Sequence, residues 1–441
     1  MATPLQLLDY YGLGYAERGR LLSEEIARCH AYHFSRNTAY RRTVSARGVG
    51  EEVRTEDLAR LLRPAALTFK GYVEWIGPFP QDDPAGFVSW LGRQLSVPLP
   101  IDLAVRLRRR YRSLEALLVD VERCCAGLGL EIVTSSGTSG QASIVARGAG
   151  TVALAVQSFF TGIQRGWGIA RGTALIFVMP EQTRVAMARS ARFGTRELDW
   201  VADSPVHYTM PFSATPDRIR IRAGRTYRPG WEGVLERKAL HPLMTWANES
   251  TVTPRFVSLT LERLREAAVE ARPVLLLGGP AQLHAIALQD TVTLPSGSRV
   301  ATGGGMKEQY PFSLEHVRAD LRRAFGAPVS DVYGMAEANW AAFECPVGNY
   351  HLPPWVHVVV TDDDDRIIDE PEAAGLLAFF DPVGGGDLIP PFFQTADSVR
   401  LVKGGGYDPV LACPCGSDSA YISGRILRVD LTEEAGCAAQ I

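Results

Sequence analysis

Val133-Thr134-Ser135-Ser136-Gly137-Thr138-Ser139-Gly140-Gln141-Ala142-Ser143 is the stretch on which the fold prediction depends. Its hydroxyl groups can donate to phosphate oxygens, and its glycines let successive backbone N–H groups approach an anion. The apolar residues 130–133 predict a strand before it, and residues 151–156 predict the start of a buried helix after it. It is not a Walker loop, because no Gly-Lys-Ser/Thr follows at the required spacing. Taken alone, it is as typical of a plain Ser/Gly surface loop as of a phosphate-binding loop.

The composition is that of a globular protein longer than one ordinary domain. The chain has 441 residues, of which 46% are hydrophobic and 22% charged, and its net charge is -3. This near-neutral balance argues against nucleic acid or an anionic membrane as a partner. No apolar run reaches the roughly 18 residues of a membrane span, and the first residues lack the pattern of a signal peptide. We therefore expect a cytoplasmic protein.

Helical periodicity dominates residues 1–120, which we expect to form a helical region packed on the core. Helices are predicted at 16–40, 58–63 and 103–121. The arginines between Arg106 and Arg112 are interpreted as the solvated face of the last helix.

Residues 121–344 alternate strands with helices, which predicts an α/β core. The expected class is a doubly wound, mainly parallel sheet with helices on both faces. Strands are predicted at 173–179, 274–277, 298–302 and 329–333, and Ser258 and Ser313 are predicted helix N-caps. The arginine-rich residues 181–232 show no periodicity that places them. Short strands with Gly, Pro and Asp turns predict a β-rich subdomain over 345–425, followed by a short tail, 426–441.

Three further stretches carry groups suited to a nucleotide. Gly303, Gly304 and Gly305 end a predicted strand, where open α/β sheets bind ligands, and they leave room for a flat ring. The sequence Tyr333-Gly334-Met335-Ala336-Glu337 ends the next predicted strand and offers an aromatic face and a carboxylate able to hold Mg²⁺. Asp397 can accept hydrogen bonds from ribose hydroxyls. Each stretch alone is also typical of a structural turn, and a lone aspartate such as Asp397 is far more often structural.

Together and in this order, these stretches resemble the motifs of the adenylate-forming superfamily of acyl-CoA synthetases, peptide-synthetase adenylation domains and insect luciferases. The loop is similar to the family's Ser/Thr/Gly phosphate loop, Tyr333-Gly-Met-Ala-Glu337 to its Tyr-Gly-x-Thr-Glu, and Thr395-Ala-Asp397 to its Thr-Gly-Asp. Gly424-Arg425 is similar to the Gly-Arg that ends its large domain. Gly303-Gly-Gly-Met-Lys307 and Cys413-Pro-Cys-Gly416 resemble phenylacetate–CoA ligases, the acyl-protein synthetase of bacterial bioluminescence and phenazine-pathway adenylating proteins.

The resemblance implies ATP-dependent adenylation of a small, aromatic carboxylic acid to an acyl-AMP, with release of pyrophosphate, in a pathway such as antibiotic biosynthesis. It also implies roles for individual residues. The loop residues Ser135, Ser136, Gly137, Thr138, Ser139 and Gly140 would hold the β- and γ-phosphates. Gly303, Gly304, Gly305, Tyr333 and Gly334 would border adenine, and Asp397 would bind the ribose. Glu337 would bind Mg²⁺, and Arg425 would reach the ribose or a phosphate.

Several departures from the family pattern bear on the chemistry. Ala142-Ser143 replaces the family's Pro-Lys, and Ala336 replaces the Thr before the glutamate. Lys307 is the nearest cation that the sequence places at the same crevice. The family carries a mobile domain of about 100 residues after the Gly-Arg, whereas this sequence ends at Ile441. We therefore expect slow or partner-dependent activation, without CoA thioester formation by this chain alone. The alternatives are acyl transfer to a carrier protein, an amine or CoA with partner help, and a degenerate nucleotide-binding protein.

The cysteines suggest a metal site. Cys345 and His351 are followed by Cys413 and Cys415, which together make a Cys₃His set suited to a structural zinc ion. The alternative is free thiols and a surface histidine. The likeness to zinc-bearing members of the phenylacetate–CoA ligase branch favours zinc. Cys124 and Cys125 are expected in the core.

Overall fold

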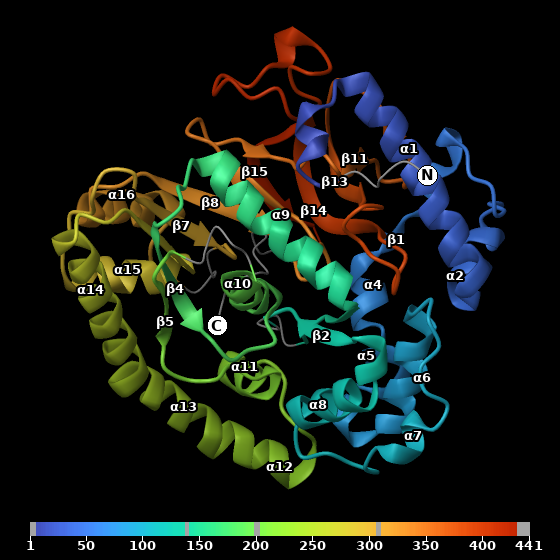
Figure 1. The fold of residues 1–441 in the computed structure, drawn as a ribbon. Coiled ribbons are helices and arrows are strands. Elements are labelled where there is room, and N and C mark those ends of the chain that lie inside the picture. The colour runs from blue at the N-terminus through green and yellow to red at the C-terminus, as the bar shows by residue number, and fades with distance from the viewer. Residues whose placement is uncertain (1–5, 137–140, 198–202, 306–309, 430–441) are drawn as a thin grey trace.

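One continuous hydrogen-bonded sheet organises the chain (Figure 1). In this computed structural model, the described residues are 6–136, 141–197, 203–305 and 310–429. The strand order is β12-β11-β13-β14-β15-β10-β9-β8-β7-β6-β4-β5, with the short β1 (Arg63–Pro64) paired to β14. A separate two-stranded hairpin, β2 and β3, lies outside this sheet.

The parallel half of the sheet is the doubly wound core that the sequence predicts. Its strands are β4 (Ala174–Pro180), β5 (Val206–Met210), β6 (Val274–Gly278), β7 (Arg299–Gly303) and β8 (Val329–Gly334), and every pair among them is parallel. Along β4, Leu175 and Phe177 face one apolar cluster, whereas Ile176 and Val178 face another. This alternation shows that both faces of the sheet are covered.

Helices cover the two faces of this parallel half. The helices α9 (Ala149–Trp167) and α10 (Ala186–Glu197) supply the first cluster. The second cluster comes from α14 (Thr253–Val269), α15 (Pro280–Gln289) and α16 (Leu314–Phe325). Ser313 caps α16 as predicted, because its hydroxyl accepts a hydrogen bond from the His316 N–H, and Gly326 ends the helix in the left-handed conformation.

The β-rich residues continue the same sheet in antiparallel pairing. These strands are β9 (Ala341–Glu344), β10 (Tyr350–His351), β11 (His357–Thr361), β12 (Ile367–Ile368), β13 (Glu372–Phe380), β14 (Phe392–Val402) and β15 (Tyr421–Arg428). The change of direction falls between β8 and β9. β15 pairs with both β10 and β14, and so connects β9 and β10 to the other antiparallel strands.

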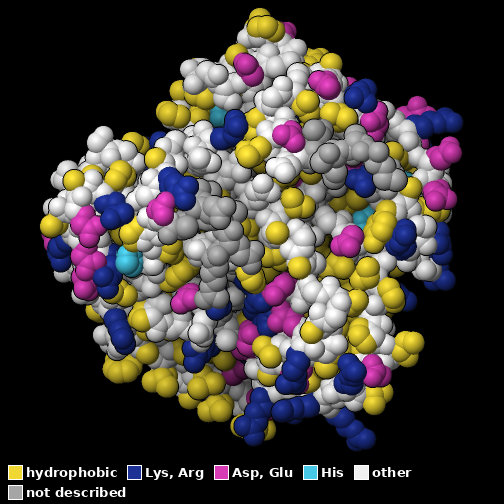
Figure 2. Space-filling view, viewed as in Figure 1, with side chains coloured by type: hydrophobic (Ala, Val, Ile, Leu, Met, Phe, Trp, Pro, Cys, Tyr) yellow, Lys and Arg dark blue, Asp and Glu magenta, His cyan; other side chains and the backbone are white. Residues whose placement is uncertain are grey.

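The N-terminal region is helical, and its longest helix packs against the antiparallel strands. Its α-helices are α1 (Tyr15–Arg36), α2 (Thr38–Ala46), α3 (Leu58–Leu61), α4 (Ala65–Lys70), α5 (Tyr72–Ile76), α6 (Pro84–Gln94), α7 (Leu103–Arg106) and α8 (Leu114–Cys124). Ile26 of α1 and Val44 of α2 share a core cluster with Phe380 and Phe392 of the sheet. No helix of the described ranges is long and apolar enough to cross a membrane. Figure 2 shows charged side chains of both signs spread over one face of the molecule.

Several helix predictions are wrong in their bounds. The predicted helix 16–40 is divided at Asn37, which separates α1 from α2, and the predicted helix 58–63 ends at Leu61. The predicted helix 103–121 is broken: α7 ends at Arg106, and α8 begins after Ser113, whose hydroxyl accepts from the Ala116 N–H. Leu107 and Tyr111 are buried although they lie between the helices, so the apolar spacing continued across the break. Ser258 is no N-cap, because α14 begins at Thr253 as the continuation of a helical segment. This segment comprises α12 (Gly230–Leu235), a π-helix (Glu236–Leu240), α13 (His241–Ala247) and a second π-helix (Asn248–Val252).

Candidate nucleotide and acyl site

The Ser/Thr/Gly loop begins at the end of a hairpin. β2 (Glu131–Thr134) confirms the strand predicted before the loop, but it pairs antiparallel with β3 (Ile144–Arg147) before α9 starts. The Ser135 N–H donates to the Ser143 carbonyl over 3.1 Å, and the Ser143 N–H donates to the Ser135 hydroxyl over 2.8 Å. Gly137, Thr138, Ser139 and Gly140 lie outside the described residues, so their predicted phosphate contacts stay predictions.

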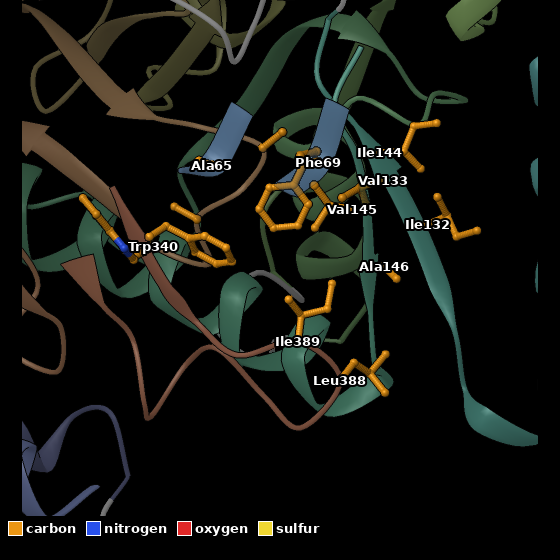
Figure 3. Close-up of a cluster of buried hydrophobic side chains, with 14 of the residues drawn as sticks. Ala65, Phe69, Ile132, Val133, Ile144, Val145, Ala146, Trp340, Leu388 and Ile389 are labelled. Carbon is orange, nitrogen blue, oxygen red and sulfur yellow. The ribbon is translucent and has the colours of Figure 1, made fainter. Parts of the chain in front are cut away.

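Polar and apolar contacts fix the hairpin on both sides. Arg184, which is buried, donates to the Ile132 carbonyl over 2.9 Å and forms ion pairs with Glu115 and Glu122 of α8. Figure 3 shows the apolar support, in which hairpin side chains pack near Phe69 and Trp340. The stem of the loop is therefore a rigid platform.

Gly303, Gly304 and Gly305 end β7, next to the carboxyl end of β8. Gly303 pairs with Val332 of β8, and a Cβ atom at Gly303 would lie 2.9 Å from a Val332 methyl carbon. Gly304 and Gly305 have φ angles of 82° and 66°, which side chains disfavour. Lys307 falls in a part of the chain that the structure leaves undescribed.

Two predicted ligand residues meet at this sheet edge. The Tyr333 hydroxyl at the end of β8 donates to the Asp397 carboxylate of β14 over 2.6 Å, and both residues are buried. Asp397 also lies opposite Arg428 of β15, whose Nε is 3.9 Å from an Asp397 oxygen. Arg425, which the resemblance places at the nucleotide, is exposed on the same strand. Arg428 is thus a cation that the structure brings close to Asp397, and sequence reasoning missed it.

A buried arginine holds the turn that carries Glu337. Nη2 of Arg147 donates to the carbonyls of Ala336 and Ala338 over 2.8 and 2.7 Å. Burial lowers the pKa of Arg147 to about 10, so its guanidinium stays charged at neutral pH, where the carboxyl groups of Glu337 and Asp381 act on it electrostatically. Burial raises the pKa of Asp381 to about 7. Glu337 is half-buried, and its carboxylate could hold Mg²⁺.

The predicted Cys₃His set comes together in space. The ligand atoms of Cys345, His351, Cys413 and Cys415 all lie within 4.8 Å of one another. The Cys345 and Cys413 sulfurs are 3.9 Å apart, close to the roughly 3.8 Å that Zn–S bonds of about 2.3 Å give in a tetrahedron. Nδ1 of His351 lies 2.8 Å from the Ser419 hydroxyl, which would orient the ring so that Nε2 faces the sulfurs. The donor set therefore fits zinc.

Comparison with known proteins identifies the fold. No protein-family model and no curated protein sequence matches this chain. An open-conformation crystal structure of 2-hydroxyisobutyryl-CoA ligase with 2-HIB-AMP and CoA matches with a TM-score of 0.56 and 13% identity, over 94% of this chain and 76% of that chain. The same ligase in the postadenylation state with R3-HIB-AMP matches with a TM-score of 0.56 and 14% identity, over 95% and 69%. The chain therefore shares the fold of 2-hydroxyisobutyryl-CoA ligase, which agrees with the fold that the resemblance implies.

Proposed function

We propose that this protein activates a small carboxylic acid with ATP, forming an acyl-AMP and releasing pyrophosphate. The hydrogen bond between Tyr333 and Asp397 carries the proposal, because it joins two motifs that lie 64 residues apart in the sequence. Tyr333 directly follows Val332, the β8 residue that pairs with Gly303, at the carboxyl edge of the parallel strands, where folds of this kind bind ligands. The likeness in fold to a ligase whose structure holds 2-HIB-AMP supports the same reaction class.

Different residues would position the ribose, the phosphates and the Mg²⁺ ion of the bound nucleotide. Asp397 would accept hydrogen bonds from the ribose hydroxyls, held in place by Tyr333 and faced by Arg428. Ser135 and Ser136 at the loop stem would donate to phosphate oxygens, together with the undescribed part of the loop. Bound at Glu337, Mg²⁺ would neutralise phosphate charge.

The reaction needs little covalent chemistry from the protein. A carboxylate oxygen of the acid attacks the α-phosphorus, the bond from that phosphorus to the bridging oxygen breaks, and pyrophosphate leaves with the electron pair. Catalysis then comes from alignment and from charge neutralisation. The acyl acceptor of a second step is CoA, a carrier protein or an amine; the 2-hydroxyisobutyryl-CoA ligase structure holds CoA beside its adenylate.

We also propose a structural zinc ion at the Cys₃His cluster of Cys345, His351, Cys413 and Cys415. All four positions are protein ligands, which is typical of structural sites that leave no position open for water. The ion would fasten the segment before β15 to the segment between β9 and β10, close to the junction of the two halves of the sheet.

A direct search for the product tests the proposed function. The protein is incubated with ATP, Mg²⁺ and a pool of small carboxylic acids, and acyl adenylates are sought by mass spectrometry. We expect one acid to appear as its AMP ester. Tight binding of ATP without any acyl adenylate would favour the alternative of a degenerate nucleotide-binding protein.

A further inference from the structure

A small cavity lies directly beside the loop stem and the turn after β8. Its walls come from the β2–β3 hairpin, from α9 and α10, and from residues 334–341. The residues that determine its polarity and size are Thr134, Arg147, Phe159, Met187, Asn339 and Trp340. Ser135 and Ala336 also border it, so the proposed function places the acid's acyl group in this cavity.

Four residues of the wall contain polar atoms that no described residue pairs with. They are the Thr134 hydroxyl, Nε of Arg147, Nε1 of Trp340 and Oδ1 of Asn339. Thr134, Arg147 and Trp340 are 0%, 4% and 4% exposed. Three of these groups donate hydrogen bonds and one accepts. Because buried polar groups in native proteins nearly always have partners, the cavity is suited to a ligand with an oxygen atom that accepts several hydrogen bonds.

The cavity is too small for an aromatic ring. Its volume is about 50 Å³, whereas a cavity of about 150 Å³ is known to bind benzene. A single water molecule needs about 10 to 15 Å³ by the same measure, so the cavity accommodates only a few heavy atoms. Phe159 and Trp340 both line it.

Resting on the proposed function, we propose that the acid is a short aliphatic acid whose acyl chain carries a hydroxyl or oxo group. The group would accept hydrogen bonds from Thr134, Arg147 and Trp340, and a hydroxyl would in addition donate to Asn339. The acid does not need a second carboxylate of its own to compensate the charge of Arg147, because the carboxyl groups of Glu337 and Asp381 already act on that charge. This class replaces the aromatic acid that the sequence resemblance implies.

Matched acids test the size and the polar group separately. ATP–pyrophosphate exchange is measured with lactate, pyruvate, propionate and benzoate. We expect lactate or pyruvate to exceed propionate in kcat/KM by about tenfold or more, and benzoate to give no exchange. Propionate equal to both would overturn the polar assignment, and benzoate as the best substrate would overturn the size assignment. In either case the proposed adenylation would stand, whereas no exchange with any acid contradicts the proposed function itself.

Two variants locate the effect in the cavity. Thr134→Val removes an unpartnered hydroxyl from a strand without changing the shape of the side chain, so it should lower kcat/KM about tenfold for the preferred oxygen-bearing acid and much less for propionate. Thr151→Val is the matched control, because its hydroxyl is also buried and unpartnered among the described residues but does not border the cavity. Met187→Ala should enlarge the cavity and allow exchange with benzoate. Equal responses of the Thr134 and Thr151 variants, or no gain with Met187→Ala, would contradict the assignment.

Discussion

The Tyr333 hydroxyl donates a 2.6 Å hydrogen bond to the Asp397 carboxylate across the boundary between the parallel and antiparallel halves of the sheet. In the strand order, β9, β10 and β15 separate the two strands that carry these residues. The contact therefore depends on the curvature and packing of the whole sheet rather than on neighbouring strands. It fixes a buried carboxylate at the Tyr333 hydroxyl, near the end of β8, where the nucleotide ribose is proposed to bind.

Asp397→Asn should weaken nucleotide binding. The variant keeps the size of the side chain but loses the charge, and hydrogen bonds to charged groups contribute about 1.5 to 3 kcal/mol. We expect the dissociation constant for ATP, measured by calorimetry, to rise roughly 10- to 100-fold. Asp363→Asn, at an exposed turn, is the control and should bind like the original protein. Equal affinity in both variants would remove Asp397 from the site.

Glu337→Gln should abolish most of the activity, because it removes the carboxylate proposed to hold Mg²⁺. Lys307→Ala, whose effect is predicted from sequence alone, should lower adenylation by roughly 10- to 1000-fold, the scale of losing one charge-stabilising donor. The measurement is exchange activity over a Mg²⁺ titration, in which the Glu337 variant should need more Mg²⁺ than the Lys307 variant. Full activity of Lys307→Ala beside an inactive Glu337→Gln would leave Mg²⁺ as the main cation.

The Cys₃His cluster should hold one zinc ion per chain, measured by elemental analysis of protein purified without a histidine tag. Cys413→Ser should lose the ion and lower the melting temperature by roughly several degrees, since binding a metal to the native state stabilises it. Cys124→Ser is the control, because Cys124 lies outside the cluster and is half-buried. Less than about a tenth of an equivalent of zinc, with no effect of chelation, would sink the proposal.

Asp381 should make the protein less stable as pH rises from about 4 to 7. Burial raises the pKa of its carboxyl from the ordinary 3.8 to about 7, so in this window the native state binds the proton that the unfolded chain releases. The stabilisation is complete below the unfolded pKa and is lost through the folded pKa. Between pH 5 and 7.5, we expect the free energy of unfolding to fall by about 1 to 3 kcal/mol more in the original protein than in Asp381→Asn. Parallel curves from urea denaturation would contradict this assignment.

The α/β core could be predicted from the sequence because its signals are local. The strands β4 and β6 are continuous apolar runs, and Ser313 and Gly326 mark the ends of α16. The predicted helix boundaries were wrong where tertiary packing, rather than local sequence, determines where a helix begins or ends. Leu107 and Tyr111 remain buried outside any helix, and Ser258 lies inside a helix that continues from earlier turns. The joining of the antiparallel strands β10 and β14 into one sheet depends on long-range pairing of β15, which no local pattern indicates.

Some residues of the candidate site could likewise be predicted from the sequence, whereas others are revealed only by the structure. Tyr333, Asp397 and the four zinc ligands belong to motifs or spacings, and the structure brings Tyr333 to Asp397 and the four ligands to one another. Arg147 and Arg428 are single arginines on strands, so only their positions in space reveal that they face Glu337 and Asp397. What distinguishes these two arginines from exposed arginines is their burial, which the sequence does not show.

Acid-dependent exchange of labelled pyrophosphate into ATP is the decisive measurement for the proposed adenylation. We expect exchange that requires both Mg²⁺ and an acid, is greatest with a short oxygen-bearing acid, and falls by at least about 100-fold in Glu337→Gln. A protein that binds ATP yet shows no acid-dependent exchange over a broad panel of carboxylic acids would contradict it.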